Sequence, residues 1–376
     1  MEDMISLALA RVRWKLYKLF MLLSLGRLGG RGPDRDLIYS IAESRTDPKV
    51  LSHLNCMHRM SEAHLERFDY LPNVPECFVR VKAVQERNLY ALKKVALSAE
   101  TGAIWIPGRC VFVESLGSTI HFYAWGGFVD VMRSATPLAD NSIVVACANL
   151  GYFHWLLDVM GQVLIAERET RGEMKLLVSN KSHRFINEGL AFFGFDESRI
   201  IRIGRPALVD RTLLVSRNSD LGLFYRENIA CLRASILQRV RIPERSTRLI
   251  YVSRRHERSR AILNEDRLED VVRAYGFEIC YFEKMPFSLQ MQTIAEAKVV
   301  MGVHGAGLAN IIAGTNDLRV VELINPTWVN PCFAQLACQL GFEYRSLTMC
   351  REQDGVFAPL QEVAHLLQGM LSGMEA

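Results

Sequence analysis

The 376-residue sequence lacks several features that define common classes of protein. The longest apolar run of the N-terminal segment, from Leu19 to Leu25, is far shorter than the ~20 residues of a membrane-spanning helix. Its nine cysteines are scattered, and none forms a CxxC pair. There is also no secretory apolar region followed by a cleavage site of small residues. These absences indicate reduced thiols in a cytoplasmic protein rather than a disulfide framework.

Other absences exclude classes of activity. The net charge is only +4, so the composition gives no strong attraction to nucleic acid. No G-x-S-x-G motif is present, which argues against an α/β hydrolase, and no glycine turn is followed by GKS or GKT, which excludes a P-loop. With 49% hydrophobic and 23% charged residues, the chain is globular and long enough for two domains.

The order of the predicted elements indicates an α/β protein. Short β-branched and aromatic segments between Val79 and Met132 predict antiparallel strands and hairpins. From Ser142 onward strands alternate with helices, and a second alternating series follows the RIPERSTR segment at 241–248. Such alternation predicts parallel sheets, here in two Rossmann-like domains that face a cleft. The predicted parts are an N-terminal helical extension (1–75), an α/β domain that begins with hairpins (76–240) and a second Rossmann-like domain (241–376).

The N-terminal extension contains a basic amphipathic segment at residues 11–28. Its lysines and arginines alternate with aromatic and aliphatic residues, a pattern typical of helices that lie on an anionic membrane surface. A helix that packs on its own domain, with its basic side chains reaching out to solvent, gives the same pattern. Glycines and a proline at 29–36 end the segment.

The most informative stretch is KVVMGVHGAGLANIIAGTNDLRVVEL, which begins at residue 298. It predicts a buried strand, a glycine-rich turn, a short helix and a second strand that ends at Glu322. Gly305 and Gly307 allow the backbone to approach a ligand closely, and the N–H groups that open the helix suit a phosphate. An acidic residue at the end of the next strand is where α/β nucleotide sites bind ribose.

This pattern predicts a pocket for a nucleoside diphosphate, whereas the alternative is a turn that serves packing alone. His304 favours the pocket, because a polar side chain among apolar residues is costly to bury without a partner. The residues of the predicted site are Gly302, His304, Gly305, Ala306, Gly307 and Glu322.

An arginine-rich loop follows the predicted strand RLIYVS. Arg254 and Arg255 come directly after Ser253, Arg258 and Arg260 come later in the same loop, and Asn-Glu-Asp at 264–266 opens the next helix. Ligands bind beyond the carboxyl ends of strands in open α/β sheets, and arginine forks match phosphate oxygens. A solvated charged loop is the alternative.

A histidine and a carboxylate lie four residues apart in YFHWLLD, so His154 and Asp158 share one face of a predicted helix. Such a pair at a helix start can bind or deprotonate a hydroxyl, with the carboxylate orienting the imidazole. A structural pair in a buried helix is the alternative.

We predict no metal site. The spacing of one polar cluster fits no zinc pattern. The members of this cluster are His53, Cys56, His58 and His64. Asp34 and Asp36 form a DxD, but no apolar strand precedes it.

Three motifs together resemble glycosyltransferase family 61, in particular its bacterial members of capsular polysaccharide synthesis. They are YFHWLLD at 152–158, YVSRR at 251–255 with the later NED, and GVHGAGLAN at 302–310 with the later VVEL. The resemblance covers residues from about 140 to about 350.

The resemblance implies a GT-B-like fold, in which residues 241–376 bind the nucleotide-sugar donor and residues 76–240 face the acceptor. It implies transfer with inversion and without a metal or other cofactor. Carried onto this sequence, Arg254 and Arg255 would neutralise the diphosphate beside the turn at 304–307, and Glu322 would bind the ribose. We expect a UDP-linked sugar as donor and a glycan or lipid-linked glycan as acceptor, with the protein in the cytoplasm or on the inner face of the membrane. Asp158 or His154 would be the base.

Two alternatives stay open. A nucleotide-sugar epimerase would need NAD and a Tyr-x-x-x-Lys pair, and Tyr90 with Lys94 has that spacing. A non-catalytic scaffold would bind nucleotide or glycan and organise a polysaccharide assembly without turnover.

Overall fold

The structure is a computed structural model of the whole chain. It describes residues 38–39, 52–62, 64–67, 74–75, 78, 81–84, 87–107, 110–116, 135–217, 224–256, 262–353 and 355–372. Several predictions lie outside the described residues: the amphipathic segment at 11–28, the Asp34–Asp36 pair, Arg258 and Arg260, and the side chains of Cys56 and His64. Among the described residues, no helix combines the length and the apolar character needed to cross a membrane.

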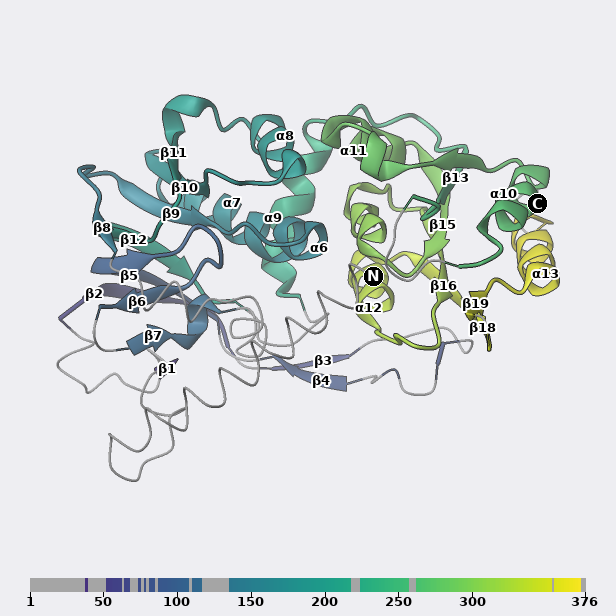
Figure 1. Cartoon of the computed structure of the whole chain (residues 1–376), viewed down its shortest axis with the longest axis horizontal. Helices are drawn as coiled ribbons and strands as arrows, with labels where there is room; N and C mark the ends of the chain where they lie inside the picture. The colour runs from purple at the N-terminus through teal and green to yellow at the C-terminus, as the bar shows by residue number, and fades with distance from the viewer. Residues whose placement is uncertain are drawn as a thin grey trace, which may run out of the picture.

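A mixed sheet lies at one end of the molecule (Figure 1). Its strand order is β1-β7-β6-β5-β12-β8, and β2 also pairs with β5. The pairs among β2, β5, β6, β7 and β12 are antiparallel, whereas the short strand β1 pairs in parallel with β7 and the short strand β8 pairs in parallel with β12. Strands β5, β6 and β7 lie in the range 79–132 where hairpins were predicted. Residues 38–39, 54–61 and 64–67 are strands, so the prediction of a helical extension over 1–75 is wrong for these segments. The strands are β1 (Ile38–Tyr39), β2 (Leu54–Ser61), β5 (Arg87–Leu97), β6 (Ile104–Ile106), β7 (Cys110–Phe112), β8 (Thr136–Pro137) and β12 (Ala207–Val215). A separate antiparallel pair is formed by β3 (His64–Arg67) and β4 (Val81–Val84), and the 3₁₀ turn η1 (Val113–Ser115) follows β7.

A three-stranded parallel sheet, in the order β11-β10-β9, follows in the N-terminal half. Strands β9 and β10 are short apolar runs that are largely buried, because one face of the sheet packs against helices and the other against the mixed sheet, whereas β11 is only partly buried. The strands are β9 (Ile143–Cys147), β10 (Met174–Ser179) and β11 (Ile200–Ile203). The helices are α6 (Tyr152–His154), the π-helix η2 (Trp155–Met160), α7 (Gly161–Glu169), α8 (Arg184–Phe192), the 3₁₀ turn η3 (Glu197–Arg199) and α9 (Arg226–Leu237).

The C-terminal half is built on a five-stranded parallel sheet in the order β14-β13-β15-β16-β17. The strands are β13 (Arg248–Val252), β14 (Glu278–Cys280), β15 (Ala297–Val303), β16 (Arg319–Ile324) and β17 (Glu343–Thr348). In chain order this is 2-1-3-4-5, so the sheet changes direction of growth between β13 and β15. Ligands bind at such a switch point in open α/β sheets.

Helices surround this second sheet. They are α10 (Glu265–Ala274), η4 (Phe282–Lys284), α11 (Phe287–Ala295), η5 (Ala306–Ala313), α12 (Cys332–Leu340) and α13 (Leu360–Ser372), with a hairpin of β18 (Cys350–Glu352) and β19 (Gly355–Phe357). The predicted helix after the glycine turn is present as η5, but it is a 3₁₀ helix rather than an α-helix. The alternating series therefore form a mixed α/β fold with two parallel sheets, as predicted.

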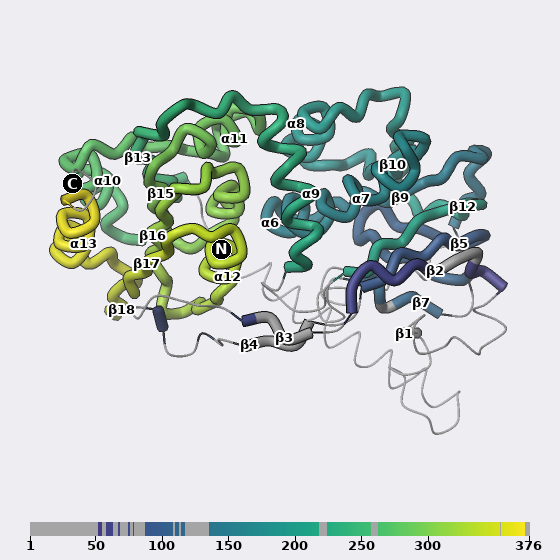
Figure 2. Tube along the Cα trace, turned by 180° about the vertical axis from the view of Figure 1, so that it is seen from behind, coloured from purple at the N-terminus to yellow at the C-terminus, as the bar shows by residue number. Residues whose placement is uncertain are grey.

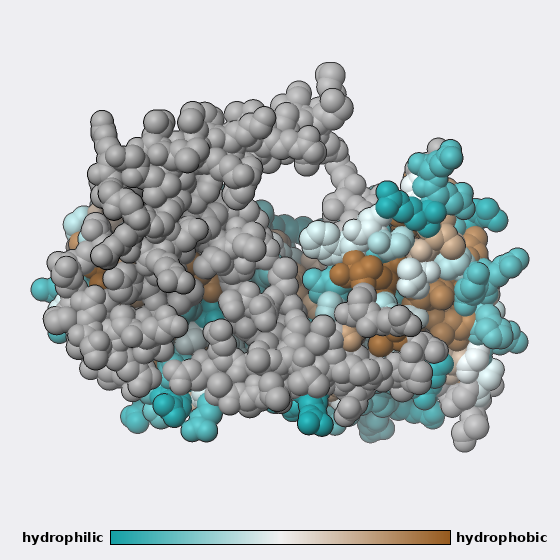
Figure 3. Space-filling view, turned by 90° about the horizontal axis from the view of Figure 1, so that it is seen from below, coloured by the Kyte–Doolittle hydropathy of each residue, from teal (hydrophilic) through white to brown (hydrophobic). Residues whose placement is uncertain are grey.

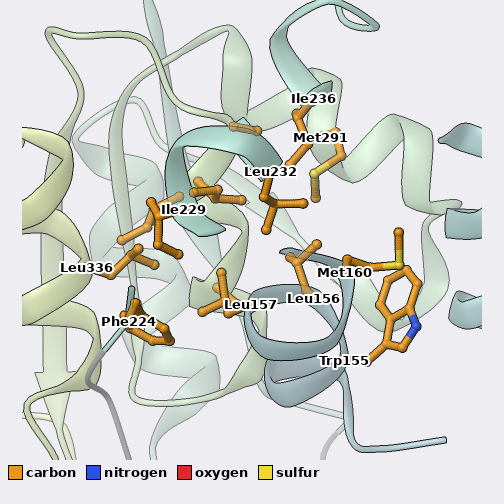
Figure 4. Close-up of a cluster of buried hydrophobic side chains, with 14 of the residues drawn as sticks. Trp155, Leu156, Leu157, Met160, Phe224, Ile229, Leu232, Ile236, Met291 and Leu336 are labelled. Atoms are coloured by element: carbon orange, nitrogen blue, oxygen red, sulfur yellow. The ribbon is translucent and has the colours of Figure 1, made fainter. Parts of the chain in front are cut away.

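One hydrophobic cluster joins the two halves. Figures 1 and 2 show helices α6, α9, α11 and α12 between the two parallel sheets. Leu156 and Leu157 of η2 lie beside Leu232 of α9, Met291 of α11 and Leu336 of α12 (Figure 4). All five of these side chains are almost completely buried. The interior between the sheets is therefore a continuous apolar core.

The described surface carries few large apolar side chains. Those that are exposed are Ile242, Leu263, Leu289, Trp328 and Val329. Seen from below, apolar residues of the C-terminal half lie beside polar ones (Figure 3). Exposed apolar residues distributed over several elements are usual in soluble proteins and do not define a binding face.

Candidate functional site

A pocket of about 370 Å³ lies between the two halves. Its C-terminal wall consists of residues 252–254, which follow β13, and residues 306–307, which follow β15. The pocket therefore opens at the switch point of the five-stranded sheet, where ligands are expected. Tyr152 follows β9, and three residues of α8 follow β10, so the carboxyl ends of the three-stranded parallel sheet are directed to the same pocket. The α8 residues are Arg184, Phe185 and Glu188, and the remaining lining residues are Phe282, Glu283 and Gln290.

Arg254 lies directly over the glycine turn. A Cβ atom on Gly305 would lie 1.9 Å from Nη1 of Arg254, so only glycine leaves room for the guanidinium in this position. A Cβ atom on Gly307 would lie 3.0 Å from Cγ1 of Val252, and one on Gly302 would lie 3.2 Å from the Val252 carbonyl oxygen. The glycines thus allow β13 and the turn after β15 to approach each other. The result is a cation beside backbone N–H groups, an arrangement that suits a phosphate.

A buried carboxylate holds the arginine loop in place. Oε1 of Glu265 accepts hydrogen bonds from the Tyr251 hydroxyl at 2.8 Å, the Ser253 hydroxyl at 2.9 Å and the Arg254 backbone N–H at 3.1 Å. Burial and the neighbouring Glu265 raise the pKa of Tyr251 well above its ordinary value, so the phenol stays a donor. The backbone of Arg254 is therefore fixed before any ligand binds.

Glu269 performs a similar task one helical turn later. Its Oε1 lies 2.9 Å from the Ser253 hydroxyl and 3.0 Å from the Tyr281 hydroxyl. Its Oε2 lies 3.3 Å from Nη2 of Arg255. The two predicted arginines therefore differ: Arg254 lines the pocket, and Arg255 pairs with a carboxylate. Neither glutamate was assigned a role from the sequence. The signal that could have indicated one is their spacing, because residues four apart on a helix share one face.

His304 and Glu322 are buried next to the turn. Nδ1 of His304 forms a hydrogen bond with Oε1 of Glu322, and the Tyr344 hydroxyl donates to Oε2 at 2.6 Å. Burial, followed by the Glu322 charge, raises the pKa of Tyr344 well above its ordinary value. Glu322 has no exposed surface, so in this structure its carboxylate orients His304 and offers nothing to a ribose. Neither residue is among the described residues that line the pocket.

A polar network crosses between the halves at the pocket floor. The Tyr152 hydroxyl lies 2.5 Å from Oδ1 of Asn310 and 3.2 Å from Oε1 of Gln290. Nδ2 of Asn310 donates to the same Gln290 oxygen at 2.9 Å, and Nε2 of Gln290 donates to the carbonyl oxygen of Phe282 at 2.8 Å. Burial raises the pKa of Tyr152, so its hydroxyl remains protonated. Sequence reasoning missed this network because its members are distant in the chain.

The predicted contact between His154 and Asp158 is present. Nδ1 of His154 lies 2.7 Å from Oδ2 of Asp158, and their side chains are 21% and 29% exposed. Asp158 lies in the π-helix η2, a rare geometry that is frequent at functional sites. Helix α6, which ends at His154, packs against η5, which follows the glycine turn. The pair is not among the described residues that line the 370 Å³ pocket.

Asp158 borders a smaller cavity that a half-buried arginine also lines. The cavity, about 10 Å³ in volume, is lined by Arg217 and Gln162 among others. Nε of Arg217 donates to Oε1 of Gln162 at 3.2 Å, and its Nη1 donates to the carbonyl oxygen of Thr101 at 3.2 Å. Burial lowers the pKa of Arg217, and the charge of Asp158 opposes that shift. Arg217 therefore supplies a positive charge behind the candidate base.

The structure does not support the Tyr-x-x-x-Lys pair on which the epimerase alternative depends. Tyr90 and Lys94 both lie in strand β5, where residues four apart are separated by ~13 Å. Tyr90 is fully buried in the mixed sheet, and neither residue is among the described residues lining the pocket.

Within the described ranges, no group of three or more His, Cys, Asp or Glu side chains is arranged to hold a metal ion. His53 instead forms a hydrogen bond with the carbonyl oxygen of Lys93 at 3.0 Å.

Comparison with known proteins connects this geometry to a family. The model of the family Glycosyltransferase 61 matches residues 152–321, a range that begins at Tyr152 and ends in β16. The EGF domain-specific O-linked N-acetylglucosamine transferase of Drosophila melanogaster is 32% identical over 161 residues, which cover 38% of this chain and 30% of that protein.

Two rice proteins (Oryza sativa subsp. japonica) are also similar. Beta-1,2-xylosyltransferase RCN11 is 33% identical over 92 residues, covering 24% of this chain and 16% of the relative. Alpha-1,3-arabinosyltransferase XAT2 is 22% identical over 241 residues, covering 56% and 41%. The matched regions thus span less than half of each relative.

These matches show that the chain is similar to glycosyltransferase family 61 over the range that contains the residues lining the pocket. The relatives described here come from plants and an insect, so they give no support to the bacterial capsular branch that the sequence resemblance suggested.

Proposed function

We propose that the protein is an inverting glycosyltransferase that moves a sugar from a UDP-linked donor to a hydroxyl of a glycan. The observation that carries this proposal is the position of Arg254, held over Gly305 at the switch point of a parallel sheet. The match of residues 152–321 to the family model supports it, because that range contains both residues.

In this proposal the C-terminal half binds the donor. Arg254 and the N–H groups of the turn at 304–307 contact the diphosphate, and Glu265 keeps the arginine loop in its binding conformation. When the sugar leaves, negative charge grows on the diphosphate oxygen. A fixed cation and fixed N–H groups stabilise that charge without reorganising, which is the main source of catalysis in such sites. They supply the stabilisation that a metal ion supplies in other transferases.

The N-terminal half presents the acceptor. Residues 76–240 and 241–376 then correspond to the two parts of a GT-B-like enzyme, with the carboxyl ends of both parallel sheets at one pocket. Asp158 or His154 takes the proton of the acceptor hydroxyl. The hydroxyl oxygen attacks the anomeric carbon from the face opposite the diphosphate. The new glycosidic bond forms as the bond to the diphosphate breaks, and the configuration inverts.

The proposed setting is cytoplasmic synthesis of a cell-surface polysaccharide, for which the acceptor is a glycan or lipid-linked glycan. The basic segment at 11–28 would hold the enzyme on the inner face of the membrane. The sequence resemblance supports this setting, and the donor chemistry above does not depend on it.

Ligand-dependent thermal stability tests the proposal. UDP, GDP, CMP, TDP, NAD and S-adenosylmethionine are each added to the wild-type chain and to Arg254→Ala. Arg267→Ala is the matched control, because Arg267 is an exposed arginine on α10. A nucleoside diphosphate at 100 times its Kd should add about 2.7 kcal/mol of stability. The stabilisation should be lost in Arg254→Ala and kept in Arg267→Ala.

Turnover then separates the remaining classes. Release of UDP from UDP-xylose, UDP-arabinose or UDP-N-acetylglucosamine, with a glycan acceptor present, would establish the transferase. Stabilisation by NAD alone would favour an epimerase. Binding of a nucleotide sugar without turnover on any glycan would favour the scaffold.

A further inference from the structure

The pocket contains a carboxylate for which the proposed mechanism has no use. Glu188 lies on α8, in the wall opposite Arg254, and its side chain is 30% exposed. Its Oε2 accepts a hydrogen bond from the backbone N–H of Phe287 at 3.0 Å. Its Oε1 lies 3.3 Å from Nε of Arg184. Two groups from different elements therefore fix the carboxylate in the wall of the pocket.

Phosphate recognition alone gives no reason for this residue. A carboxylate in a diphosphate pocket repels the ligand, and it can only accept hydrogen bonds when ionised. In a nucleotide sugar, the groups that can donate hydrogen bonds to a carboxylate are the hydroxyls of the ribose and the sugar and the N–H groups of the base or of an acetamido substituent, and the hydroxyls are the most numerous. A carboxylate offers about four lone-pair positions, and among the described residues the contacts with Phe287 and Arg184 use two of them.

Glu322, which the sequence predicted to bind the ribose, is not available for that contact. Glu322 is fully buried, and its two oxygens contact His304 and Tyr344. Glu188, in contrast, borders the pocket beside apolar rings. The rings of Phe185 and Tyr152 meet edge to face at 5.1 Å, and Phe282 lies on the opposite wall. Apolar surroundings exclude water and strengthen a hydrogen bond to a charged acceptor.

We propose that Glu188 accepts a hydrogen bond from a hydroxyl of the bound nucleotide sugar and thereby selects the donor. This inference rests on the proposed function, because it assigns a specificity role within the same pocket. The hydroxyl belongs either to the ribose or to the transferred sugar, and the two sources are chemically alike at this carboxylate. Arg184 acts with Glu188 as a positioning residue, since it orients one of the two oxygens.

Affinity ratios measured by calorimetry test the proposal. The probes are UDP, 2′-deoxy-UDP, 3′-deoxy-UDP, UDP-xylose and UDP-N-acetylglucosamine, and the proteins are wild type, Glu188→Gln and Glu283→Gln. Glu283 is the matched control, because it is an exposed carboxylate that lines the same pocket. Either substitution removes one negative charge, so both should strengthen diphosphate binding in general. Only Glu188→Gln should change the ratio between a ligand with the hydroxyl and one without it.

If Glu188 binds the ribose, wild type should prefer UDP over one deoxy analogue by about 10-fold or more, the usual effect of a hydrogen bond to a charged group. Glu188→Gln should reduce that ratio towards one. If Glu188 binds the transferred sugar, the ratio of the affinity for the UDP-sugar to the affinity for UDP should instead be lower in Glu188→Gln than in wild type, by a similar factor. Glu188→Asp, which keeps the charge but shortens the side chain, should give an intermediate ratio in either case.

The inference would be overturned, while the proposed function stands, if two affinity ratios were the same in Glu188→Gln, Glu283→Gln and wild type. These are the ratio of UDP to its deoxy analogues and the ratio of UDP-sugar to UDP. Failure of wild type to bind any of the UDP ligands would reject the proposed function itself. Melting temperatures of the variants show whether they are folded, and a ratio of two affinities in one folded variant is insensitive to a general loss of stability.

Discussion

The two halves of the molecule line one pocket with different kinds of structure. The C-terminal half contributes strand ends and a glycine turn, where backbone groups and Arg254 are fixed by the buried Glu265. The N-terminal half contributes side chains of short helices, such as Tyr152 and Glu188. A site for a constant group such as a diphosphate can be built from backbone, whereas recognition of a variable group needs exchangeable side chains. The comparison therefore predicts that substitutions in the two halves separate donor binding from chemistry and specificity.

The largest effect is expected for Asp158→Asn in the N-terminal half. Loss of a general base lowers the rate of transfer by about 10²–10⁴-fold, whereas the affinity for UDP should stay the same. The melting temperature should fall slightly, because the half-buried Arg217 loses a compensating charge. Single-turnover transfer and calorimetry measure the two quantities. Asp270→Asn, an exposed carboxylate on α10, is the control. Loss of both sugar transfer and UDP binding, together with aggregation, would show that the contact between His154 and Asp158 is structural.

Arg254→Ala should affect binding and chemistry together. The guanidinium is expected to contact the diphosphate in both the ground state and the transition state. We expect transfer to fall by about 10²–10³-fold, with weaker UDP binding. Arg255→Ala should have a much smaller effect, because Arg255 pairs with Glu269. Equal effects of the two substitutions would contradict the division of roles that the structure indicates.

A pair of glycine substitutions separates binding from stability. In Gly305→Ala, the new methyl group would displace the end of the flexible Arg254 side chain, so UDP affinity should fall by about 10-fold while stability changes little. In Gly189→Ala, the methyl group would lie 2.1 Å from the buried Trp155 ring, which should cost about 1–3 kcal/mol of folding free energy. Thermal melts with and without UDP measure both. If Gly305→Ala lowered the stability and left UDP affinity unchanged, the glycine turn would serve packing rather than ligand binding.

The smallest effect concerns a surface pair of the N-terminal half. A hydrogen bond from Lys175, helped by Ser142, lowers the pKa of Asp140 to about 2 from an ordinary value of 3.8. A lowered carboxyl pKa stabilises the fold above pH 3.8, and that stabilisation is lost as the pH falls through about 2. Asp140→Asn should therefore cost about 0.2–1 kcal/mol at pH 7 and much less at pH 2. Denaturant melts at the two pH values would show a constant difference if the idea is wrong.

Sequence reasoning identified the part of the site that is local in the chain. The glycine turn, Arg254 and the contact of His154 with Asp158 follow from short spacings, and the structure has each of these features. It also recognised two alternating series of strands and helices.

The rest depends on tertiary packing. No local signal indicates that Glu188 and Arg254, 66 positions apart, line one pocket, because this requires the relative position of the two sheets. The burial of Glu322 is another case: its place at the end of a strand suggested a ribose contact. Whether that carboxylate turns towards a ligand or towards His304 and Tyr344 is decided by residues that meet only in the folded state.

The continuous apolar core has a thermodynamic consequence. Leu157 of the N-terminal half packs in the same cluster as Leu336 of the C-terminal half. Unfolding of the helices of either half would therefore expose apolar side chains of the other half to water. The two halves should therefore melt as one cooperative unit, with a single heat-absorption peak. For the same reason, opening of the pocket is confined to loops and side chains, and entry of a donor does not require the halves to swing apart.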